Sequence, residues 1–222
     1  MHTLVRDNVC DVNIKLDSLM NTYHHGDLRA ALLAQARQAL EADGGGGFSL
    51  RGLAAAVGVS PNAPYRHFPN KESVLAAVST QGFAELTARF EPYRSADGPD
   101  RLAGCLTAYL SFARGNPGLY RLMFGRDLDP LSCDEALGAQ AQACFTALMS
   151  IVAHLLNTDM VDSRVPKAAT LVWSLCHGAA LLDIDRTAAF LVESQRLDAV
   201  DLAITLTAGL GAQILIPTSQ VR

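Results

Sequence analysis

Residues 48–75 contain side chains that could read duplex DNA. Asn62 lies near the start of an expected short helix, where its amide could pair with adenine, and Pro61 and Ala63 beside it could touch a thymine methyl. Arg51, in the preceding helix, could reach guanine. The chemistry predicted for this stretch is therefore hydrogen bonding and apolar contact with base edges in the major groove.

Three further residues, Tyr65, His67 and Lys71, have the chemistry of phosphate contacts. Such contacts fix a protein's register on the duplex but carry little sequence information. A helix is expected to begin near Lys71, and the free backbone N–H groups of its first turn could bind a phosphate directly. The alternative is that the aromatic side chains are core residues and Arg51 is a solvated charge, and for Phe68 we favour the core. The full predicted DNA-binding set is Arg51, Ser60, Pro61, Asn62, Ala63, Tyr65, His67 and Lys71.

Two short helices joined by a tight turn must position these side chains. Apolar residues recur with helical spacing over residues 50–57, Ser49 is expected as the N-cap, and Gly58 is expected to end this helix in the left-handed conformation. Ser60 is expected to cap a second helix of about two turns, which ends near Phe68.

The second helix contains one irregularity, and a third helix follows it. Pro64 removes one backbone hydrogen bond, which is tolerable in a first turn and costly later. Asn70 is expected to cap a helix that begins at Lys71, with Glu72 favoured in its first turn by the helix dipole. These parts together predict a helix-turn-helix reader of DNA.

The same stretch resembles the DNA-binding domain of the TetR (tetracycline repressor) family. The resemblance covers residues 26–75 and rests on three segments, GDLRAALLAQARQAL, FSLRGLAAAVGVS and YRHFPNKESVL. Proteins of this family are typically all-α homodimers, usually repressors, that a small ligand releases from DNA. The resemblance therefore implies a ligand-responsive transcriptional regulator, more often a repressor, with an activator as the open alternative.

Two departures from the family pattern bear on the domain boundaries. Residues 44–47 are four glycines, which lengthen or loosen the joint after the first helix. Residues 1–22 precede the part that resembles the family and are expected to form a disordered arm, and Met20 could be the true start. We expect the helix-turn-helix domain at residues 23–72 and a helical ligand-binding and dimerisation domain at residues 73–222.

Composition favours an all-α protein of the cytoplasm. Half of the 222 residues are hydrophobic and only 6% are aromatic, and Ala and Leu dominate, which favours helix over strand. No apolar run reaches the roughly 18 residues of a membrane span, and residues 1–20 lack the apolar segment of a secretory signal. The five scattered cysteines lack CxxC spacing, so reduced thiols are expected.

Charge gives the weakest support for DNA binding, because the net charge is −4. Residues 1–75 hold seven Lys/Arg and seven Asp/Glu, whereas residues 76–222 hold eleven and fifteen. The acidic excess therefore lies away from the reading helices. Arg51, Arg66 and Lys71 could still form a basic face locally. The affinity for DNA should depend on a modest number of phosphate contacts.

The remaining helices are expected to form the second domain. Turn residues divide the chain into helices at about 71–93, 100–115, 116–124, 132–157, 166–183 and 197–216. The last two are apolar nearly all round, so each needs two partners. We expect this pair to form a four-helix homodimer interface with a second subunit, although deep burial within one subunit is the alternative. Two-fold symmetry would place two reading helices about 34 Å apart, as a palindromic operator requires.

A small-molecule pocket is expected among the central helices. Trp173 and His177 are spaced i, i+4 and share a face, and Trp-x3-His-Gly resembles a ligand-domain subgroup named after those three residues. Cys176 lies beside His177, but no further ligand at suitable spacing supports a metal. Each candidate alone is more often plain core. The candidates are Phe112, Tyr120, Met123, Phe124, Met149, Trp173 and His177, which suit a hydrophobic or aromatic effector.

Motifs of catalysis are missing from the sequence. There is no G-x-S-x-G, no H-E-x-x-H and no phosphate-binding glycine loop before a helix. We therefore expect no enzyme activity, no cofactor and no metal. The rival from another class is a helical ligand-binding module whose reader is vestigial. In the regulator hypothesis, a ligand in the central cavity moves the helix that begins at Lys71 and so displaces the reading heads.

Overall fold

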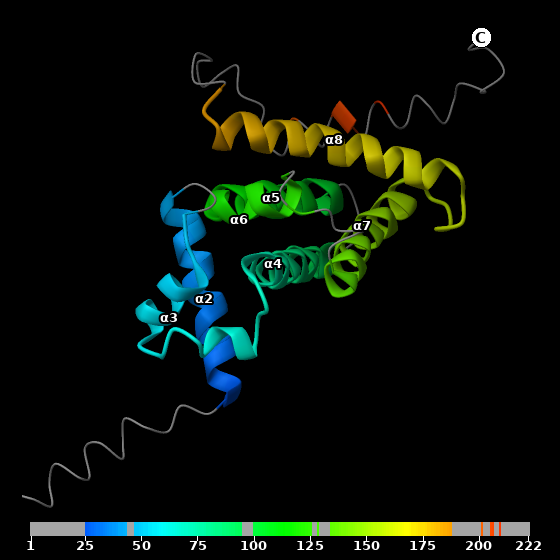
Figure 1. Cartoon of the computed structure of the whole chain (residues 1–222). Coiled ribbons are helices and arrows are strands. Elements are labelled where there is room, and N and C mark those ends of the chain that lie inside the picture. The colour runs from blue at the N-terminus through cyan, green and yellow to red at the C-terminus, as the bar shows by residue number, and fades with distance from the viewer. Residues whose placement is uncertain are drawn as a thin grey trace, which may run out of the picture.

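The computed structural model describes residues 25–43, 47–94, 100–125, 128, 134–187, 201, 205–206 and 209. Within these residues the chain is all-helical, as the sequence predicts, with seven α-helices and one 3₁₀ turn (Figure 1). The expected N-terminal arm and nearly all of the expected last helix, 197–216, lie outside the described residues. The elements are α2 (His25–Asp43), α3 (Leu50–Val57), η1 (Pro64–Arg66), α4 (Lys71–Arg94), α5 (Asp100–Gly115), α6 (Pro117–Phe124), α7 (Glu135–Leu155) and α8 (Arg164–Ile184).

The ends of α3 are fixed by the residues that the sequence singles out. The Ser49 hydroxyl accepts a hydrogen bond from the Gly52 N–H at 3.0 Å, which satisfies one of the free donors of the first turn. Gly58 has φ of 77°, and the Val59 N–H donates back to the Ala54 carbonyl at 2.9 Å. This left-handed residue turns the chain toward residues 60–68, which we call the reading segment.

The expected two-turn second helix is wrong in length. Residues 61–63 form a turn in which the Ala63 N–H donates to the Ser60 carbonyl at 3.0 Å, and only the single 3₁₀ turn η1 follows. Proline at position 64 has no N–H to continue an α-helical ladder from Ser60, so the ladder does not form. The backbone carbonyl of Ser60 therefore accepts the Ala63 N–H and closes a turn instead of starting an α-helix.

The N-terminus of α4 is capped as expected. The Asn70 side-chain oxygen accepts from the Ser73 N–H at 2.8 Å, and the Ser73 hydroxyl donates to the Asn70 carbonyl at 2.7 Å. This reciprocal pair fixes the direction in which the 24-residue α4 leaves the reading segment.

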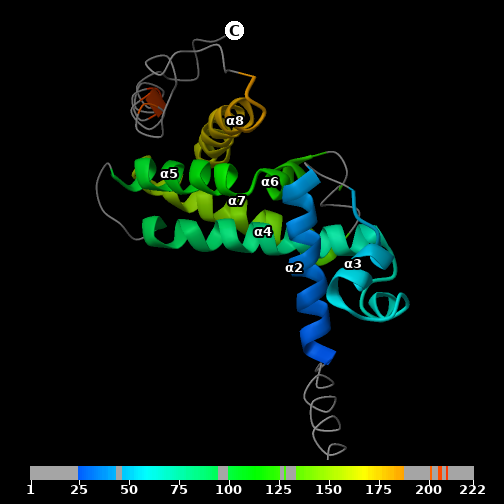
Figure 2. The same ribbon diagram turned by 90° about the vertical axis from the view of Figure 1, so that its left-hand side faces the viewer.

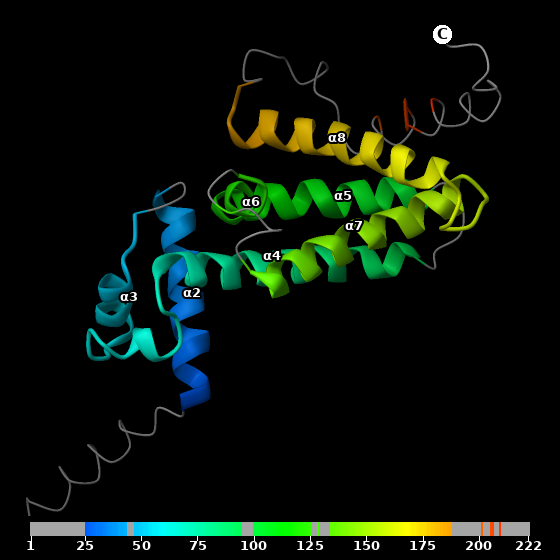
Figure 3. The ribbon, with the colours of Figure 1, turned by 45° about the vertical axis from the view of Figure 1, so that its right-hand side comes forward.

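Helix α4 is the axis of the molecule. One end lies against α2 and near α3, and the rest extends beneath α5 and across α7 (Figure 2). Figure 3 shows α4, α5 and α8 as successive layers, with α7 crossing beside them. The most extensive helix pair is α4 with α7, and α5 and α7 both support α8.

A single apolar core joins the two ends of this arrangement. It runs from Leu33 in α2 through Val78 and Leu86 in α4 to Ile151 in α7 and Val172 in α8, all nearly inaccessible to solvent. Burial of each such side chain contributes about 1.5–3 kcal/mol to folding. Because the core is continuous, the reading segment and the helices of the second domain are mechanically connected.

The outer face of α8 is apolar but uncovered by the described residues. Leu171, Leu175 and Leu182 are 44%, 46% and 50% exposed, while Val172 and Cys176 on the core-facing side are buried. By length and composition alone, α7 and α8 could each cross a membrane, but core helices share those properties, and both pack a buried face on neighbouring helices.

Candidate DNA-reading surface and ligand pocket

The predicted DNA-binding residues lie together around η1 and the start of α3. Tyr65 is 47% exposed, so its ring and hydroxyl are accessible on this surface. Ala63, His67 and Lys71 are half-buried. The other members of the set are exposed: Arg51, Ser60, Pro61 and Asn62. Arg66, adjacent to Tyr65, is exposed as well and adds a cation to the same surface.

Two buried residues hold the reading segment to the domain. Pro64 is buried, and Phe68, only 3% exposed, is a core residue as expected. The Phe68 N–H donates to the Pro64 carbonyl at 2.9 Å, and the guanidinium of Arg29 lies 5.2 Å from the Phe68 ring centroid. With residues 64 and 68 directed inward, the side chain of Tyr65 is directed outward.

Lys71 occupies the junction between the reading segment and α4. Its ammonium nitrogen lies 5.0 Å from the Phe48 ring centroid, a cation–π distance that restrains the side chain beside the start of α3. One first-turn N–H group of α4, that of Ser73, already donates to Asn70. The first turn therefore offers fewer free N–H groups to a phosphate than the sequence alone suggests.

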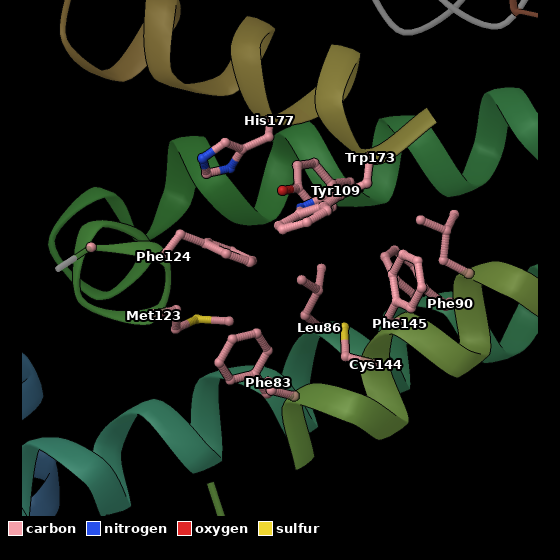
Figure 4. A pocket seen from close by; sticks show the side chains of 13 residues that line it. Phe83, Leu86, Phe90, Tyr109, Met123, Phe124, Cys144, Phe145, Trp173 and His177 are labelled. Atoms are coloured by element: carbon pink, nitrogen blue, oxygen red, sulfur yellow. The ribbon is translucent and has the colours of Figure 1, made fainter. Parts of the chain in front are cut away.

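A cavity of about 360 Å³ lies between α4, α6, α7 and α8 (Figure 4). Side chains from five helices converge on it, and α8 covers it on the side opposite α4. The lining residues are Phe83, Leu86, Phe90, Tyr109, Met123, Phe124, Gly125, Ala141, Cys144, Phe145, Leu148, Trp173 and His177.

Aromatic rings dominate the wall formed by α6 and α8. The Phe124 ring centroid lies 5.1 Å from that of His177 and 6.1 Å from that of Trp173. Phe145 of α7 meets Trp173 edge-on at 6.2 Å. Among the described lining residues there is no Asp, Glu, Lys or Arg. The cavity therefore suits an apolar, ring-containing molecule without a formal charge.

A chain of three hydrogen-bonding side chains lies along this wall. The Tyr109 and Tyr120 hydroxyl oxygens are 2.7 Å apart, and the Tyr120 oxygen is 2.6 Å from His177 Nδ1. Burial raises the pKa of both tyrosines, and it lowers the pKa of His177. The three side chains are consequently neutral at neutral pH and join α5, α6 and α8 through polar contacts.

The pocket contains four of the seven residues expected from the sequence: Met123, Phe124, Trp173 and His177. Tyr120 lies directly behind the wall, hydrogen-bonded to His177. The expectation is wrong for Phe112 and Met149. Phe112 is fully buried under the Arg89 guanidinium, and Met149 packs partly buried against the core and is not among the lining residues.

The pocket residues that the sequence did not indicate come mainly from α4 and α7. Phe83, Leu86 and Phe90 follow helical spacing on one face of α4, and this pattern also describes an ordinary core face. Cys144 and Phe145 of α7 carried no local signal at all. Only the packing of the helices distinguishes a core face from a cavity wall.

Cysteine chemistry does not add a second site. Cys105, Cys144 and Cys176 are free and buried, and burial raises the pKa of Cys144 to about 11 and that of Cys176 to about 12. Thiols with such pKa values are poor nucleophiles at neutral pH. Within the described part of the chain, no group of three or more His, Cys, Asp or Glu residues could hold a metal ion.

A capped helix and an exposed turn segment, in front of a helical domain with an apolar cavity, define the class of DNA-binding transcriptional regulators. Comparison with known families agrees. Residues 32–78 match "Bacterial regulatory proteins, tetR family", and residues 102–206 match "Tetracyclin repressor-like, C-terminal domain". The chain belongs to the TetR family. The Trp-His-Gly subgroup stays a prediction, because the matched description names no subgroup.

Relatives of known name match parts of the chain. Nucleoid occlusion factor SlmA of Haemophilus ducreyi is 36% identical over 78 residues, which are 34% of this chain and 39% of that protein. SlmA of Marinobacter nauticus is 30% identical over 131 residues, or 58% of this chain and 66% of that protein. The chain thus spans less than two thirds of the length of each of these two relatives.

Solved structures match nearly the whole chain. A protein with unknown function from Rhodococcus sp. RHA1 is 29% identical with a TM-score of 0.69, covering 87% of this chain and 98% of that one. A tetR-family transcriptional regulator from Streptomyces coelicolor is 20% identical with a TM-score of 0.64, covering 86% and 81%. At 20% identity this second likeness concerns the fold alone.

Proposed function

We propose that this chain is a ligand-responsive transcriptional regulator. It binds a palindromic operator as a homodimer and represses transcription in the cytoplasm until a small hydrophobic or aromatic effector releases it. Residues 23–72 read DNA, and residues 73–222 bind the effector and dimerise. The chain acts by binding rather than by catalysis.

The observation that carries this proposal is the course of α4. The helix begins at Lys71, beside the exposed reading segment, and Phe83, Leu86 and Phe90 on the same helix form one wall of the cavity. A molecule that fills the cavity presses on a helix whose first turn is attached to the reader. Release of DNA then requires that the effector bind the DNA-free arrangement more tightly than the DNA-bound one.

The exposed face of α8 supports the homodimer. Leu171, Leu175, Gly178 and Leu182 follow the spacing i, i+4, i+7 and i+11, which forms one continuous apolar stripe. No described atom lies within 4 Å of a Cβ built at Gly178, so another helix could approach closely there. We propose that α8 and the helix expected at 197–216 pair with the same helices of a second subunit.

The cavity supports the choice of effector class. Its volume lies at the lower end of the range for small-molecule sites, and its described lining contains aromatic, aliphatic and sulfur-containing side chains but no charged one. Desolvating an ion in such a site would be unfavourable. A neutral molecule with one or two rings is the proposed occupant.

A gel-shift titration with the DNA that flanks the chain's own gene, at two salt concentrations, tests the DNA-binding part. We expect a shift that weakens steeply with salt. Lys71→Ala should weaken binding and reduce the salt slope by about one per protomer, and Arg51→Ala should cost about 1–3 kcal/mol of binding free energy.

Arg94→Ala provides the matched control, because Arg94 is an exposed arginine that ends α4, at the far end of that helix from Lys71 and off the stripe of α8. It should bind DNA like the wild type. A folded, dimeric wild-type protein that shifts no DNA at low salt would support the rival function, a ligand-binding module with a vestigial reader.

A further inference from the structure

Helix α2 of the reading domain touches the pocket domain at a second place besides α4. The N-terminus of α6 abuts the C-terminal half of α2, and both lie beside α4 in two views (Figures 1 and 2). The approach is as close as backbones allow. A Cβ added to Gly118 would collide with the Leu40 carbonyl group, whose carbon would lie only 2.6 Å away.

Glu41 of α2 forms the central contact of this junction. One oxygen of its carboxylate accepts the Gly118 N–H at 2.9 Å, and the other accepts the Leu119 N–H at 3.0 Å. A carboxylate at a helix N-terminus also interacts favourably with the helix dipole. The side chain of one domain thus caps a helix of the other.

Arg37, one turn earlier in α2, extends the junction. Its guanidinium pairs with Glu85 of α4, with one hydrogen bond at 2.8 Å, and donates to the Asn116 side-chain oxygen at 2.7 Å. Asn116 precedes the first residue of α6 and also donates to the Phe112 carbonyl at 2.9 Å. The pair with Glu85 raises the pKa of Arg37, so its positive charge is retained.

The C-terminal turn of α6 contributes side chains to the pocket. Met123 and Phe124 line the cavity, and the Tyr120 hydroxyl is 2.6 Å from His177 Nδ1 of α8. An eight-residue helix is only about 12 Å long and is short enough to move as a unit. Displacement of its pocket end therefore moves its capped end against α2.

We propose that Glu41 is a positioning residue that couples α6, and through it the effector pocket, directly to the DNA-reading domain. This inference rests on the proposed function, since it names the path by which the pocket controls the reader. The coupling through Glu41 is additional to the coupling through α4, because α2 and α4 are each joined to the pocket helices by separate contacts. Glu41→Gln tests it, because the glutamine amide presents a donor to one of the two N–H groups and breaks half of the cap.

The first experiment needs no ligand. Hydrogen–deuterium exchange of the full chain is measured for Tyr120→Phe in the native background and in the Glu41→Gln background. Tyr120→Phe removes the hydroxyl that joins α6 to Tyr109 and His177, so exchange in α6 should rise. With Glu41 present, exchange in α2 should change as well. With glutamine at position 41, the change in α2 should be at least halved while that in α6 persists.

Glu135→Gln is the matched control, because Glu135 is exposed in the first turn of α7 and its change also removes a carboxylate near a helix N-terminus. Circular dichroism checks that both variants are folded. The proposal would be overturned if Tyr120→Phe changed hydrogen–deuterium exchange in α2 equally in all backgrounds. It would also be overturned if Tyr120→Phe left exchange in α2 unchanged even with Glu41 present.

The second experiment repeats the exchange measurement with the neutral fluorescent probe N-phenyl-1-naphthylamine. We expect the wild type and Glu41→Gln to bind the probe with equal affinity. Probe binding should change exchange in α2 only in the protein that retains Glu41. A probe that does not bind would count against the proposed effector site, and the ligand-free comparison would still decide the role of Glu41. A probe that binds and alters α2 equally in both proteins would refute the coupling.

Discussion

His177 is a half-buried imidazole whose protonation should affect stability. Burial lowers its folded-state pKa below the ordinary value of 6.5, so the unfolded chain takes up this proton at a higher pH than the folded protein does. The contribution of His177 to the free energy of unfolding is therefore complete above the unfolded pKa and falls as the pH drops toward the folded pKa.

We predict that the stability advantage of the wild type over His177→Asn shrinks between about pH 7.5 and about pH 5.5, because asparagine retains an acceptor for Tyr120 but does not titrate. Urea unfolding at the two pH values measures this difference. An advantage that is constant or grows on acidification would contradict the assigned role of burial.

Gly58 provides a second test at the level of single residues. Its φ of 77° is unfavourable for residues with a Cβ, but no atom of the described residues lies within 4 Å of the added Cβ. We predict that Gly58→Ala lowers the free energy of unfolding by about 1 kcal/mol through backbone strain alone. Gly115→Ala is the control, because Gly115 has equal space and no positive φ, and it should not be destabilising.

Among the elements, η1 owes its form to the position of one proline. Pro61 lies in a turn where its missing N–H is harmless, whereas Pro64 removes the donor that would bond back to Ser60. We predict that Pro64→Ala shifts the Cα chemical shifts of residues 61–67 toward helical values in NMR spectra. Pro61→Ala should leave them nearly unchanged, and similar spectra for both variants would mean that packing, rather than the missing N–H, limits this element.

The elements also show what the sequence could and could not predict. The helix ends at Ser49, Gly58 and Asn70 were predicted correctly because capping depends on residues within a few positions of one another. The predicted length of the second helix is wrong because Pro64 lacks the N–H that would bond back to Ser60, and this loss outweighs the local preference for a helix.

The pocket shows the opposite limit. Trp173 and His177 were predicted from their i, i+4 spacing, but Phe145 of α7 and Phe83 of α4 were not. Both are ordinary apolar residues on helices with a buried face. Whether such a residue lines a cavity depends on the distance and angle between α4, α7 and α8, and no local pattern encodes these quantities.

For the whole molecule, the apolar stripe on α8 predicts the assembly. Leu175 lies in the middle of this stripe and is 46% exposed in the single chain. We predict that Leu175→Glu produces a monomer in sedimentation velocity and lowers operator affinity at least tenfold, because two reading heads no longer bind together. The acid would otherwise be buried without a partner in the dimer.

Val161→Glu is the control for that change. Val161 is 92% exposed in the connection between α7 and α8, off the helical stripe. The Val161→Glu variant should remain dimeric and bind DNA as the wild type does. A dimer of unchanged stability in Leu175→Glu would place the subunit contact elsewhere.

The dual use of α4 also constrains how such a protein can evolve or be engineered. Phe83, Leu86 and Phe90 line the cavity that we propose binds the effector, yet they belong to the helix whose first residue, Lys71, lies beside the reader. A substitution that broadens the range of inducers will therefore also change promoter occupancy in the uninduced cell. Biosensors built by exchanging these three side chains should need compensating changes in their promoters, whereas exchanges at Phe145, on a helix remote from the reader, should alter inducer choice with less background expression.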